Sequence, residues 1–258
     1  MTHLSLFTGI GGIDLAAEWA GFETVAMVER DKFCQQVLAK NFEGVKIHDD
    51  VTTFNGLEYR GVIDIVSAGF PCQPHSVAGL RKASGDERDL WGQVVRILRE
   101  TQSTWFLGEN VPGLLASEQG QFFGRIINDL ESLGYSVGWG CYGAKDVGAV
   151  HKRDRVFIVG NSNCKSRLQS SSTSIPFRSK RNSRENISGR YWQPVRGGDW
   201  RKWEIKAVIP QSRVCGINDG VSNRVDRLKA LGNAVVPQQV YPILVEIAKH
   251  LQTFDNQA

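Results

Sequence analysis

Apolar residues follow two different spacings along this chain, and the two alternate. Apolar runs of the length typical of buried strands occupy residues 4–7, 24–28, 62–67, 105–107 and 155–159. Between them, apolar residues recur with helical spacing over residues 13–20, 32–40, 90–99 and 122–133. Strands that alternate with helices predict an α/β fold, with a doubly wound and mostly parallel sheet whose sites form in the loops at the strand ends.

This alternation stops after Gly160, and order returns from Leu228 onward. Residues 238–251 again have the spacing of a helix, which we expect to pack back onto the first part of the chain. A chain of 258 residues suits one full core with a small appendage. The sequence therefore predicts a main domain of residues 1–160 together with 223–258, and a separate short unit of residues 161–222.

The net charge of +4 is unevenly distributed. Between Asn161 and Cys215 there are twelve basic and three acidic residues, an excess of +9, and these are interleaved with Phe177, Tyr191, Trp192, Trp200 and Trp203. Such a segment is either a flexible, solvated loop or a nucleic-acid-binding surface. We favour the binding surface.

The cysteines indicate a reducing compartment. Their wide, irregular spacing suits neither a zinc site nor a disulfide framework, so no metal is expected: Cys34, Cys72, Cys141, Cys164 and Cys215. Cys34 and Cys141 are interpreted as small buried hydrophobic residues. The chain has no basic leader with an apolar core and no apolar run near the roughly 20 residues that cross a bilayer, so we expect a soluble, intracellular protein without a membrane partner.

A glycine-rich turn, Thr8-Gly9-Ile10-Gly11-Gly12, follows the first apolar run and opens a predicted helix. Backbone amides in such a turn can approach a ligand closely. Asp14 stands where a dinucleotide fingerprint needs glycine, and the Gly-Lys-Ser/Thr of a P-loop is missing, so both of those classes are excluded. An acid at this place suits a ligand with an ammonium group, such as S-adenosylmethionine.

Two further acids follow predicted strands. Glu29 lies 20 residues after Gly9, where a carboxylate can accept hydrogen bonds from both hydroxyls of a ribose. Asp50 ends a third strand and can accept from an adenine amino group. Taken alone, Glu29 is equally well an ordinary exposed acid, and Asp50 is the weaker candidate.

A cysteine in a proline-bounded loop is the candidate nucleophile. Ala68-Gly69-Phe70-Pro71-Cys72-Gln73-Pro74 follows directly on a predicted strand. The prolines and the polar neighbours distinguish Cys72 from a buried hydrophobic cysteine, and loops above a sheet edge commonly carry nucleophiles.

An acid and two arginines complete the candidate site. Glu109 ends another predicted strand, so its carboxylate is expected at the same sheet edge as Cys72. Arg153 and Arg155 alternate before the last strand, which predicts that both point to one face of an extended segment and can bind a phosphate or a carbonyl oxygen. In isolation they also fit the start of a solvated basic strand.

In this order, five segments resemble the DNA cytosine-5 methyltransferase family. They are Phe7-Thr8-Gly9-Ile10-Gly11-Gly12, Pro71-Cys72-Gln73, Glu109-Asn110-Val111, Arg153 with Arg155, and Gly232-Asn233-Ala234-Val235-Val236-Pro237. The resemblance covers residues 1–160 and about 222–252. Pro-Cys-Gln alone is weak, whereas five motifs in the family's order are specific.

The resemblance implies a sheet of the S-adenosylmethionine-dependent methyltransferase type and assigns roles to single residues. The implied cofactor contacts are Phe7 and Asp50 with the adenine, Glu29 with the ribose, the turn glycines Gly9, Gly11 and Gly12, and Asn233 near the methionine end. Residues 161–222 correspond to an unusually short target-recognition region. The chain departs from the family at His151, where glutamine is common, and at Arg30, where an aromatic residue is frequent.

The resemblance also implies a reaction and its partners. The Cys72 thiolate adds to carbon 6 of an extruded cytosine, Glu109 contacts nitrogen 3 and the exocyclic amine, and Arg155 holds the ring carbonyl. The loop of residues 76–89 is expected to close over the base. Implied partners are double-stranded DNA and a companion restriction endonuclease, and we expect a monomeric, cytoplasmic, bacterial or phage-encoded protein. An RNA cytosine-5 methyltransferase and a catalytically silent DNA-binding relative stay open as alternatives.

Overall fold

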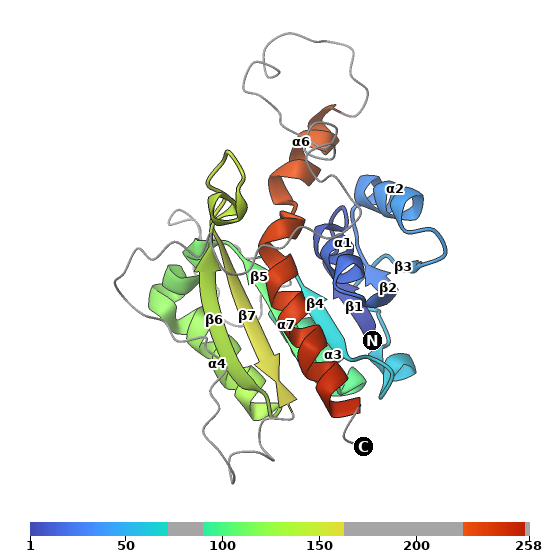
Figure 1. The fold of residues 1–258 in the computed structure, drawn as a ribbon, viewed down its shortest axis with the longest axis vertical. Helices are drawn as coiled ribbons and strands as arrows, with labels where there is room; N and C mark the ends of the chain where they lie inside the picture. The colour runs from blue at the N-terminus through green and yellow to red at the C-terminus, as the bar shows by residue number, and fades with distance from the viewer. Residues whose placement is uncertain (72–89, 163–223, 256–258) are drawn as a thin grey trace.

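The computed structural model describes residues 1–71, 90–162 and 224–255. Within this part of the chain, seven strands form one sheet in the order β3-β2-β1-β4-β5-β7-β6 (Figure 1). The strands are β1 (Thr2–Leu6), β2 (Glu23–Val28), β3 (Lys46–His48), β4 (Ile65–Ala68), β5 (Trp105–Asn110), β6 (Ser136–Tyr142) and β7 (Arg155–Asn161). All neighbours from β3 to β5 pair in parallel, and β7 runs antiparallel to both β5 and β6. The predicted α/β fold with a mostly parallel sheet is confirmed.

Helices follow the strands in the order that the sequence pattern predicts. They are α1 (Gly12–Trp19), α2 (Lys32–Asn41), α3 (Trp91–Thr101), α4 (Gln121–Ser132), α6 (Arg224–Asn233) and α7 (Pro237–Asp255). Short 3-10 turns lie at η1 (Gly56–Tyr59), η2 (Pro112–Gly120) and η3 (Ala144–Val147). Helix α7 packs against α1 on the sheet, so the predicted return of the C-terminal helix is confirmed.

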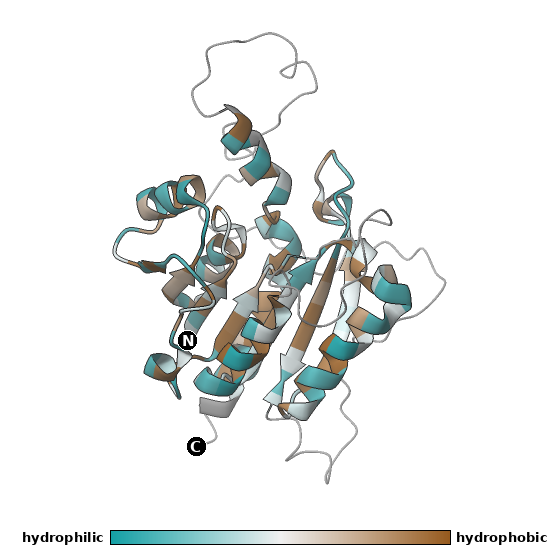
Figure 2. Ribbon diagram, turned by 180° about the vertical axis from the view of Figure 1, so that it is seen from behind, coloured by the Kyte–Doolittle hydropathy of each residue, from teal (hydrophilic) through white to brown (hydrophobic). Residues whose placement is uncertain are grey.

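Both faces of the sheet are covered, which explains why its strands are continuous apolar runs. Helices α1 and α7 cover one face, where the buried residues include Ile13, Ala16, Ile65, Leu107, Phe157, Val240 and Leu244 (Figure 1). Helices α3 and α4 cover the other face, where they include Leu4, Leu6, Val66, Val94, Ile97, Phe106, Ile126 and Ile158 (Figure 2). Two apolar layers therefore fix the sheet and the strand ends that carry the site.

Strand β6 is an edge strand that the hydrophobic pattern did not predict. It contains Gly138 and Gly140 and pairs antiparallel with β7 from Ser136 to Tyr142. Cys141 on this strand is exposed, so its interpretation as a buried hydrophobic residue is wrong. An edge strand has a partner on one side alone and keeps part of its surface in solvent. Cys34, on α2, is buried as predicted.

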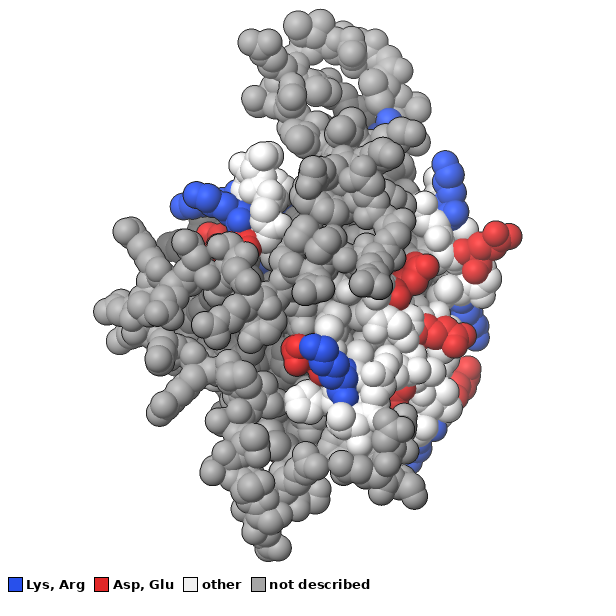
Figure 3. Space-filling model, viewed as in Figure 1, with Lys and Arg blue, Asp and Glu red and all other residues white. Residues whose placement is uncertain are grey.

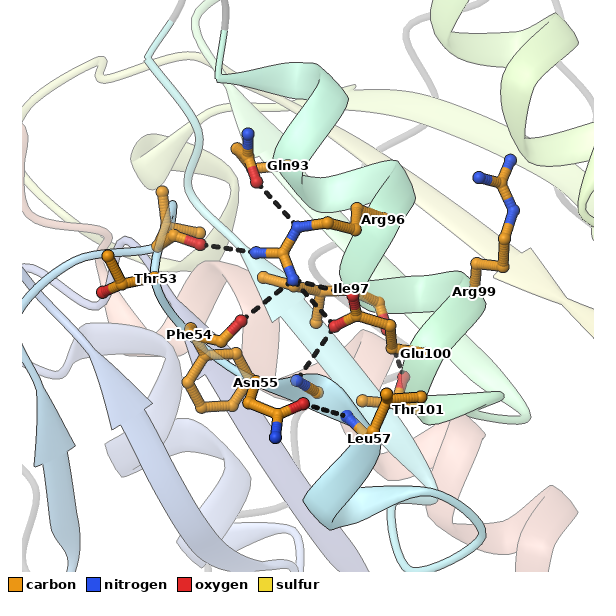
Figure 4. Close-up of polar contacts among 12 residues, drawn as sticks. Thr53, Phe54, Asn55, Leu57, Gln93, Arg96, Ile97, Arg99, Glu100 and Thr101 are labelled. Carbon is orange, nitrogen blue, oxygen red and sulfur yellow. Dashed lines mark hydrogen bonds and ion pairs between the residues drawn. The ribbon is translucent and has the colours of Figure 1, made fainter.

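The loop after β3 is fixed to α3 through Arg96 (Figure 4). Its guanidinium donates to the carbonyl oxygens of Val51 (2.8 Å) and Phe54 (2.9 Å) and pairs with the Glu100 carboxylate (2.8 Å). One rigid fork of donors thereby satisfies carbonyls that have no partner in a sheet or helix. The loop that begins near Asp50 is held in place by this contact.

Among the described residues, no helix combines the length and apolar character that crossing a membrane requires.

Candidate active site

A cavity of about 630 Å³ opens at the edge of the sheet where β1, β2, β4 and β5 end and the antiparallel β7 begins. Its volume lies within the range of about 300–1,000 Å³ typical of small-ligand sites. The sheet order reverses next to β1, and loops that diverge at such a point leave a crevice. The lining includes Phe7, Thr8, Gly9, Glu29, Arg30, Gly69, Phe70, Glu109, Arg155 and Asn233.

The glycine turn after β1 needs glycine for two separate reasons. Gly9 (φ 61°) and Gly11 (φ 87°) adopt left-handed backbone conformations, which side chains disfavour. A Cβ on Gly11 would lie 2.4 Å from the Phe42 ring, and one on Gly12 would lie 2.4 Å from the carbonyl oxygen of Val235. Gly9 therefore borders the cavity, whereas Gly11 and Gly12 allow α2 and the segment before α7 to approach the turn.

Glu29 is held by backbone amides at one end of the cavity. Its Oε2 accepts from the Gly9 amide and its Oε1 from the Asp31 amide, each at 2.7 Å. Burial raises the pKa of this carboxyl, and the hydrogen bonds from Asp31 and Gly9 lower it. Carboxylate oxygens have more than one acceptor direction, so Glu29 is a fixed acceptor that can still bind a ligand hydroxyl.

Asp14 does not face the cavity, and its interpretation as an acid presented to a ligand is wrong. Its side chain is fully buried behind Ser5, whose hydroxyl donates to Oδ2 at 3.1 Å. His3 is equally buried and lies 3.9 Å from Oδ1. Burial raises the pKa of Asp14 to about 7, opposed by the hydrogen bond from Ser5. Helix α1 points this residue into the protein.

The other predicted cofactor residues are placed as follows. Phe7 lines the cavity in a left-handed conformation (φ 54°) that non-glycine residues rarely adopt, a kind of strain that concentrates at functional sites. Asn233 and Arg30 also line the cavity and are exposed. Asp50 is not among the lining residues, and its Oδ1 accepts from the amide and hydroxyl of Thr52. Its contact with adenine stays a prediction.

Glu109 and Arg155 form a buried ion pair at the other end of the cavity. Arg155 Nε lies 2.7 Å from Glu109 Oε1, and both side chains are almost fully buried. Glu109 pairs with Phe157 across the two strands, so Arg155, two residues earlier on β7, projects from the same face. Among the described residues, Oε1 has no hydrogen bond of ordinary geometry, so its contact with Arg155 is described as an ion pair.

Opposing influences set the proton affinity of Glu109. Burial raises the pKa of this carboxyl, and the charges of Arg155 and then Arg153 lower it. A buried acid whose pKa is raised by burial and lowered by neighbouring charges is a candidate for proton exchange.

Arg153 does not lie on an extended segment, so that part of the sequence interpretation is wrong. Its φ is 33°, and β7 begins only at Arg155. The guanidinium of Arg153 donates instead to the carbonyl oxygens of Gly232, at 2.8 Å, and Ala234. Arg153 therefore binds the motif before α7 and acts on Glu109 through its charge.

Cys72 and the loop of residues 76–89 lie outside the described residues, and so does most of the segment 161–222. The residues immediately before Cys72 are fixed, since Asn110 Nδ2 donates to the carbonyl oxygen of Phe70 at 2.9 Å. Cys34 also lines the cavity. Burial, and to a smaller extent the negative charges of Glu29 and Asp31, raise the pKa of its thiol to about 12. A thiol with this pKa is not an effective nucleophile at neutral pH.

Two polar contacts near the cavity were not predicted from the sequence. Lys229 on α6 lines the cavity and pairs with Asp31 at 2.8 Å, joining α6 to the N-terminus of α2. Gln239 at the start of α7 is buried and donates to the carbonyl oxygens of Tyr142 and Arg153, each at 2.9 Å. Gln239 lies two residues after the Gly-Asn motif, and this proximity is the one sequence feature that points to it. The hydrogen-bond partners of Gln239 lie far away in the sequence.

Comparison with known proteins relates the chain to one family. The family model described as C-5 cytosine-specific DNA methylase matches residues 1–204. The Type II methyltransferase M.BsuFI of Bacillus subtilis is 40% identical over 161 residues, 62% of this chain and 39% of that protein. The Type II methyltransferase M2.BsuMI of Bacillus subtilis (strain 168) is 32% identical over 234 residues, 86% of this chain and 58% of that protein. The chain spans about half the length of the curated relatives it matches.

Solved structures share the same arrangement of strands and helices. A protein described as a DNA modification methyltransferase encoded within a prophage (E. coli) superposes with a TM-score of 0.55 at 28% identity, over 64% of this chain and 48% of that one. The S. pombe Dnmt2 methyltransferase gives a TM-score of 0.53 at 20% identity, over 68% of this chain and 57% of that one. The second likeness shows the fold alone.

Proposed function

Because this chain belongs to the C-5 cytosine-specific DNA methylase family, we propose that it transfers a methyl group to carbon 5 of cytosine in double-stranded DNA. One observation carries the proposal. A single cavity has the backbone-held carboxylate of Glu29 at one end and the buried Glu109–Arg155 pair at the other. Such a cavity can hold a donor molecule and a base side by side.

We assign the end with Glu29 to S-adenosylmethionine. Gly9 borders open space, because a Cβ there would meet no atom within 4 Å, so its backbone can approach a ligand closely. Glu29 supplies acceptors for ribose hydroxyls, Phe7 supplies an apolar ring, and Asn233 adds a polar group from the C-terminal motif. When bound, S-adenosylmethionine supplies an electrophilic methyl group at its sulfonium.

We assign Cys72 as the nucleophile. Its thiolate forms a bond to carbon 6 of cytosine, and the carbon 5–carbon 6 double bond gives its electron pair to the ring. Glu109 donates a proton toward nitrogen 3, and Arg155 offers its remaining donors to the ring carbonyl. Carbon 5 thereby becomes an enamine carbon that can take up a methyl group. Loss of the carbon 5 proton then expels the Cys72 thiolate and restores the aromatic ring.

The position of Glu109 supports extrusion of the target base. Its side chain is buried at the sheet edge, and a cytosine stacked in a duplex cannot bring its ring edge to a buried carboxyl. Unpairing one base costs a few kcal/mol, by the magnitudes typical of base-flipping enzymes.

The DNA partner is proposed from the charge of residues 161–222. On the face shown in Figure 3, basic and acidic side chains are interspersed over the described part of the molecule. The basic excess of the chain falls instead between Asn161 and Cys215. The Type II names of the relatives support a companion restriction endonuclease and a bacterial cytoplasmic setting for this chain.

Methyl transfer to duplex DNA and to transfer RNA tests the proposal directly. The purified protein is incubated with radiolabelled S-adenosylmethionine and either nucleic acid, and bisulfite sequencing identifies the modified position in DNA. We expect transfer to duplex DNA at carbon 5 of cytosine. Preferential transfer to transfer RNA would identify an RNA methyltransferase, and binding of DNA without transfer to either would identify a silent relative.

A further inference from the structure

Gln239 is a buried polar residue in a position that the family motifs do not cover. It lies in the first turn of α7 with 2% of its surface exposed. Its single Nε2 group donates to the carbonyl oxygens of Tyr142 and Arg153, each at 2.9 Å. Tyr142 ends β6 and Arg153 precedes β7, so one amide group holds both ends of the connection between these two strands.

The side chain of Arg153 in turn binds the segment that precedes α7. Its guanidinium donates to the carbonyl oxygens of Gly232, at 2.8 Å, and Ala234, in the motif directly before α7. The main chain of Arg153 is thus held by α7, while its side chain holds the segment that leads into α7. The backbone of Arg153 is left-handed at φ 33°, a conformation that non-glycine residues keep only when the surroundings impose it.

The position of Arg153 matters for Glu109. The charge of Arg153 lowers the pKa of the Glu109 carboxyl, in addition to the effect of Arg155. Arg153 is itself about half buried, and burial lowers its pKa. Charges that are partly withdrawn from solvent interact more strongly than exposed charges. We therefore expect a displacement of the Arg153 guanidinium to change the pKa of Glu109.

We propose that Gln239 is a positioning residue for the catalytic acid Glu109. By holding the Arg153 main chain, Gln239 keeps the Arg153 guanidinium on the Gly232 and Ala234 carbonyls and fixes the start of the segment that carries Arg155, the ion-pair partner of Glu109. Its catalytic meaning rests on the proposed function. The competing interpretation is that Gln239 stabilises only the connection between β6 and β7.

Gln239→Leu tests the proposal, because leucine keeps most of the buried volume and removes both donated hydrogen bonds. Two quantities are measured: the midpoint of the Glu109 titration, from the carboxyl ¹³C signal assigned with Glu109→Gln, and the single-turnover rate on duplex DNA. We expect the midpoint to move to higher pH and the rate at saturating cofactor to fall between about 10- and 100-fold, as for a misplacement near 1 Å. The KM for S-adenosylmethionine should change little.

Two comparisons separate positioning from stability. Gln238→Leu makes the same chemical change one residue earlier, on a half-buried side chain, and should leave both quantities near those of the unmodified protein. Arg153→Met removes the charge directly. If Gln239 acts through Arg153, the double variant shows the same titration midpoint as Arg153→Met alone, whereas independent effects would add.

The proposal is overturned if Gln239→Leu lowers the melting temperature while the Glu109 midpoint and the turnover stay unchanged. Should that variant not fold, Gln239→Asn, which shortens the side chain by one methylene, is measured in the same way. If the unmodified protein transfers no methyl group, the proposed function fails. The Glu109 titration in Gln239→Leu, Arg153→Met and the double variant still decides whether Gln239 positions Arg153.

Discussion

Each end of the cavity presents a glutamate, half-buried Glu29 at one end and buried Glu109 at the other, and the surroundings of the two differ. Glu29 is held by the backbone amides of Gly9 and Asp31, each at 2.7 Å. Glu109 is held by the guanidinium of Arg155, at 2.7 Å, and lies within the influence of Arg153. Burial raises the pKa of both carboxyls, so the direction of this effect is the same at the two ends.

The origin of the difference lies in the strands. Glu29 follows a parallel strand, where the chain turns into α2 and offers amides of its own backbone. Glu109 lies next to the antiparallel β7, whose first residue is Arg155. Backbone amides are fixed and neutral, and they make Glu29 a permanent acceptor. Arginines are charged, and they change the proton affinity of Glu109 through that charge. Under the proposed function, the end with Glu29 binds the cofactor and the end with Glu109 transfers a proton.

The largest effect is expected from removal of the nucleophile at the catalytic end. Cys72→Ser should abolish methyl transfer, because a serine hydroxyl is not ionised at neutral pH, while the affinity for S-adenosylmethionine stays nearly unchanged. Radiolabel transfer and isothermal titration measure the two quantities. Cys141→Ser, on the exposed edge strand β6, is the matched control and should be fully active. Transfer by Cys72→Ser at a rate near that of the control would refute the assignment.

The next effect concerns the glutamate at the same end. Glu109→Gln keeps the shape of the side chain and removes the exchangeable proton, so turnover should fall by about 100-fold or more, as for other positioned acids. Binding of cofactor and DNA should change little. Loss of DNA affinity with unchanged turnover at saturation would mean that Glu109 only positions the base.

A smaller effect is expected at the cofactor end, on the affinity for the cofactor and not on turnover. Glu29→Gln places an amide NH₂ group against one of the two backbone donors, and the affinity for S-adenosylmethionine should fall about tenfold, as expected for a hydrogen bond to a charged group. Turnover at saturating cofactor should stay near its original value. A large fall in turnover with unchanged affinity would remove the distinction between the two glutamates.

The smallest effect is expected at Asp14, which is buried behind the cofactor end of the cavity, and it concerns the stability of the fold. Asp14 has its pKa raised by burial to about 7, so the folded protein keeps a proton there that the unfolded chain loses above its ordinary pKa of 3.8. Stability from this group is therefore lost as the pH rises from about 4 to about 7. Asp14→Asn removes this titration and should raise the melting temperature at pH 8 more than at pH 5. An equal change at both pH values would contradict the buried, protonated state.

The sequence allowed the fold and part of the site to be predicted for a physical reason. Strands buried on both faces give unbroken apolar runs, and the carboxyl ends of neighbouring parallel strands meet at one edge, so Glu29 and Glu109 could be assigned to one site. Strand β6 could not be predicted, because its glycines and its exposed edge remove that apolar signal. Local pattern also could not show that Asp14 points inward.

Contacts between residues that lie far apart in the sequence could not be predicted from local sequence patterns. Arg153 was predicted as an alternating partner of Arg155, but its backbone is set by contacts with residues about 80 positions away. Gln239 and Arg96 carry no motif of their own, and their importance follows from carbonyl partners on other elements. Such contacts become visible only when the elements are placed in space.

Covalent trapping tests the central claim most directly. The protein is incubated with S-adenosylmethionine and a duplex in which 5-fluorodeoxycytidine replaces every cytosine of one strand, and the products are separated under denaturing conditions. Fluorine at carbon 5 cannot leave as a proton, so the unmodified protein should remain covalently attached to the DNA, and Cys72→Ser should not. If the unmodified protein methylates ordinary cytosine in duplex DNA but forms no denaturation-resistant complex with the fluorinated duplex, the reaction does not pass through Cys72 and the account is contradicted.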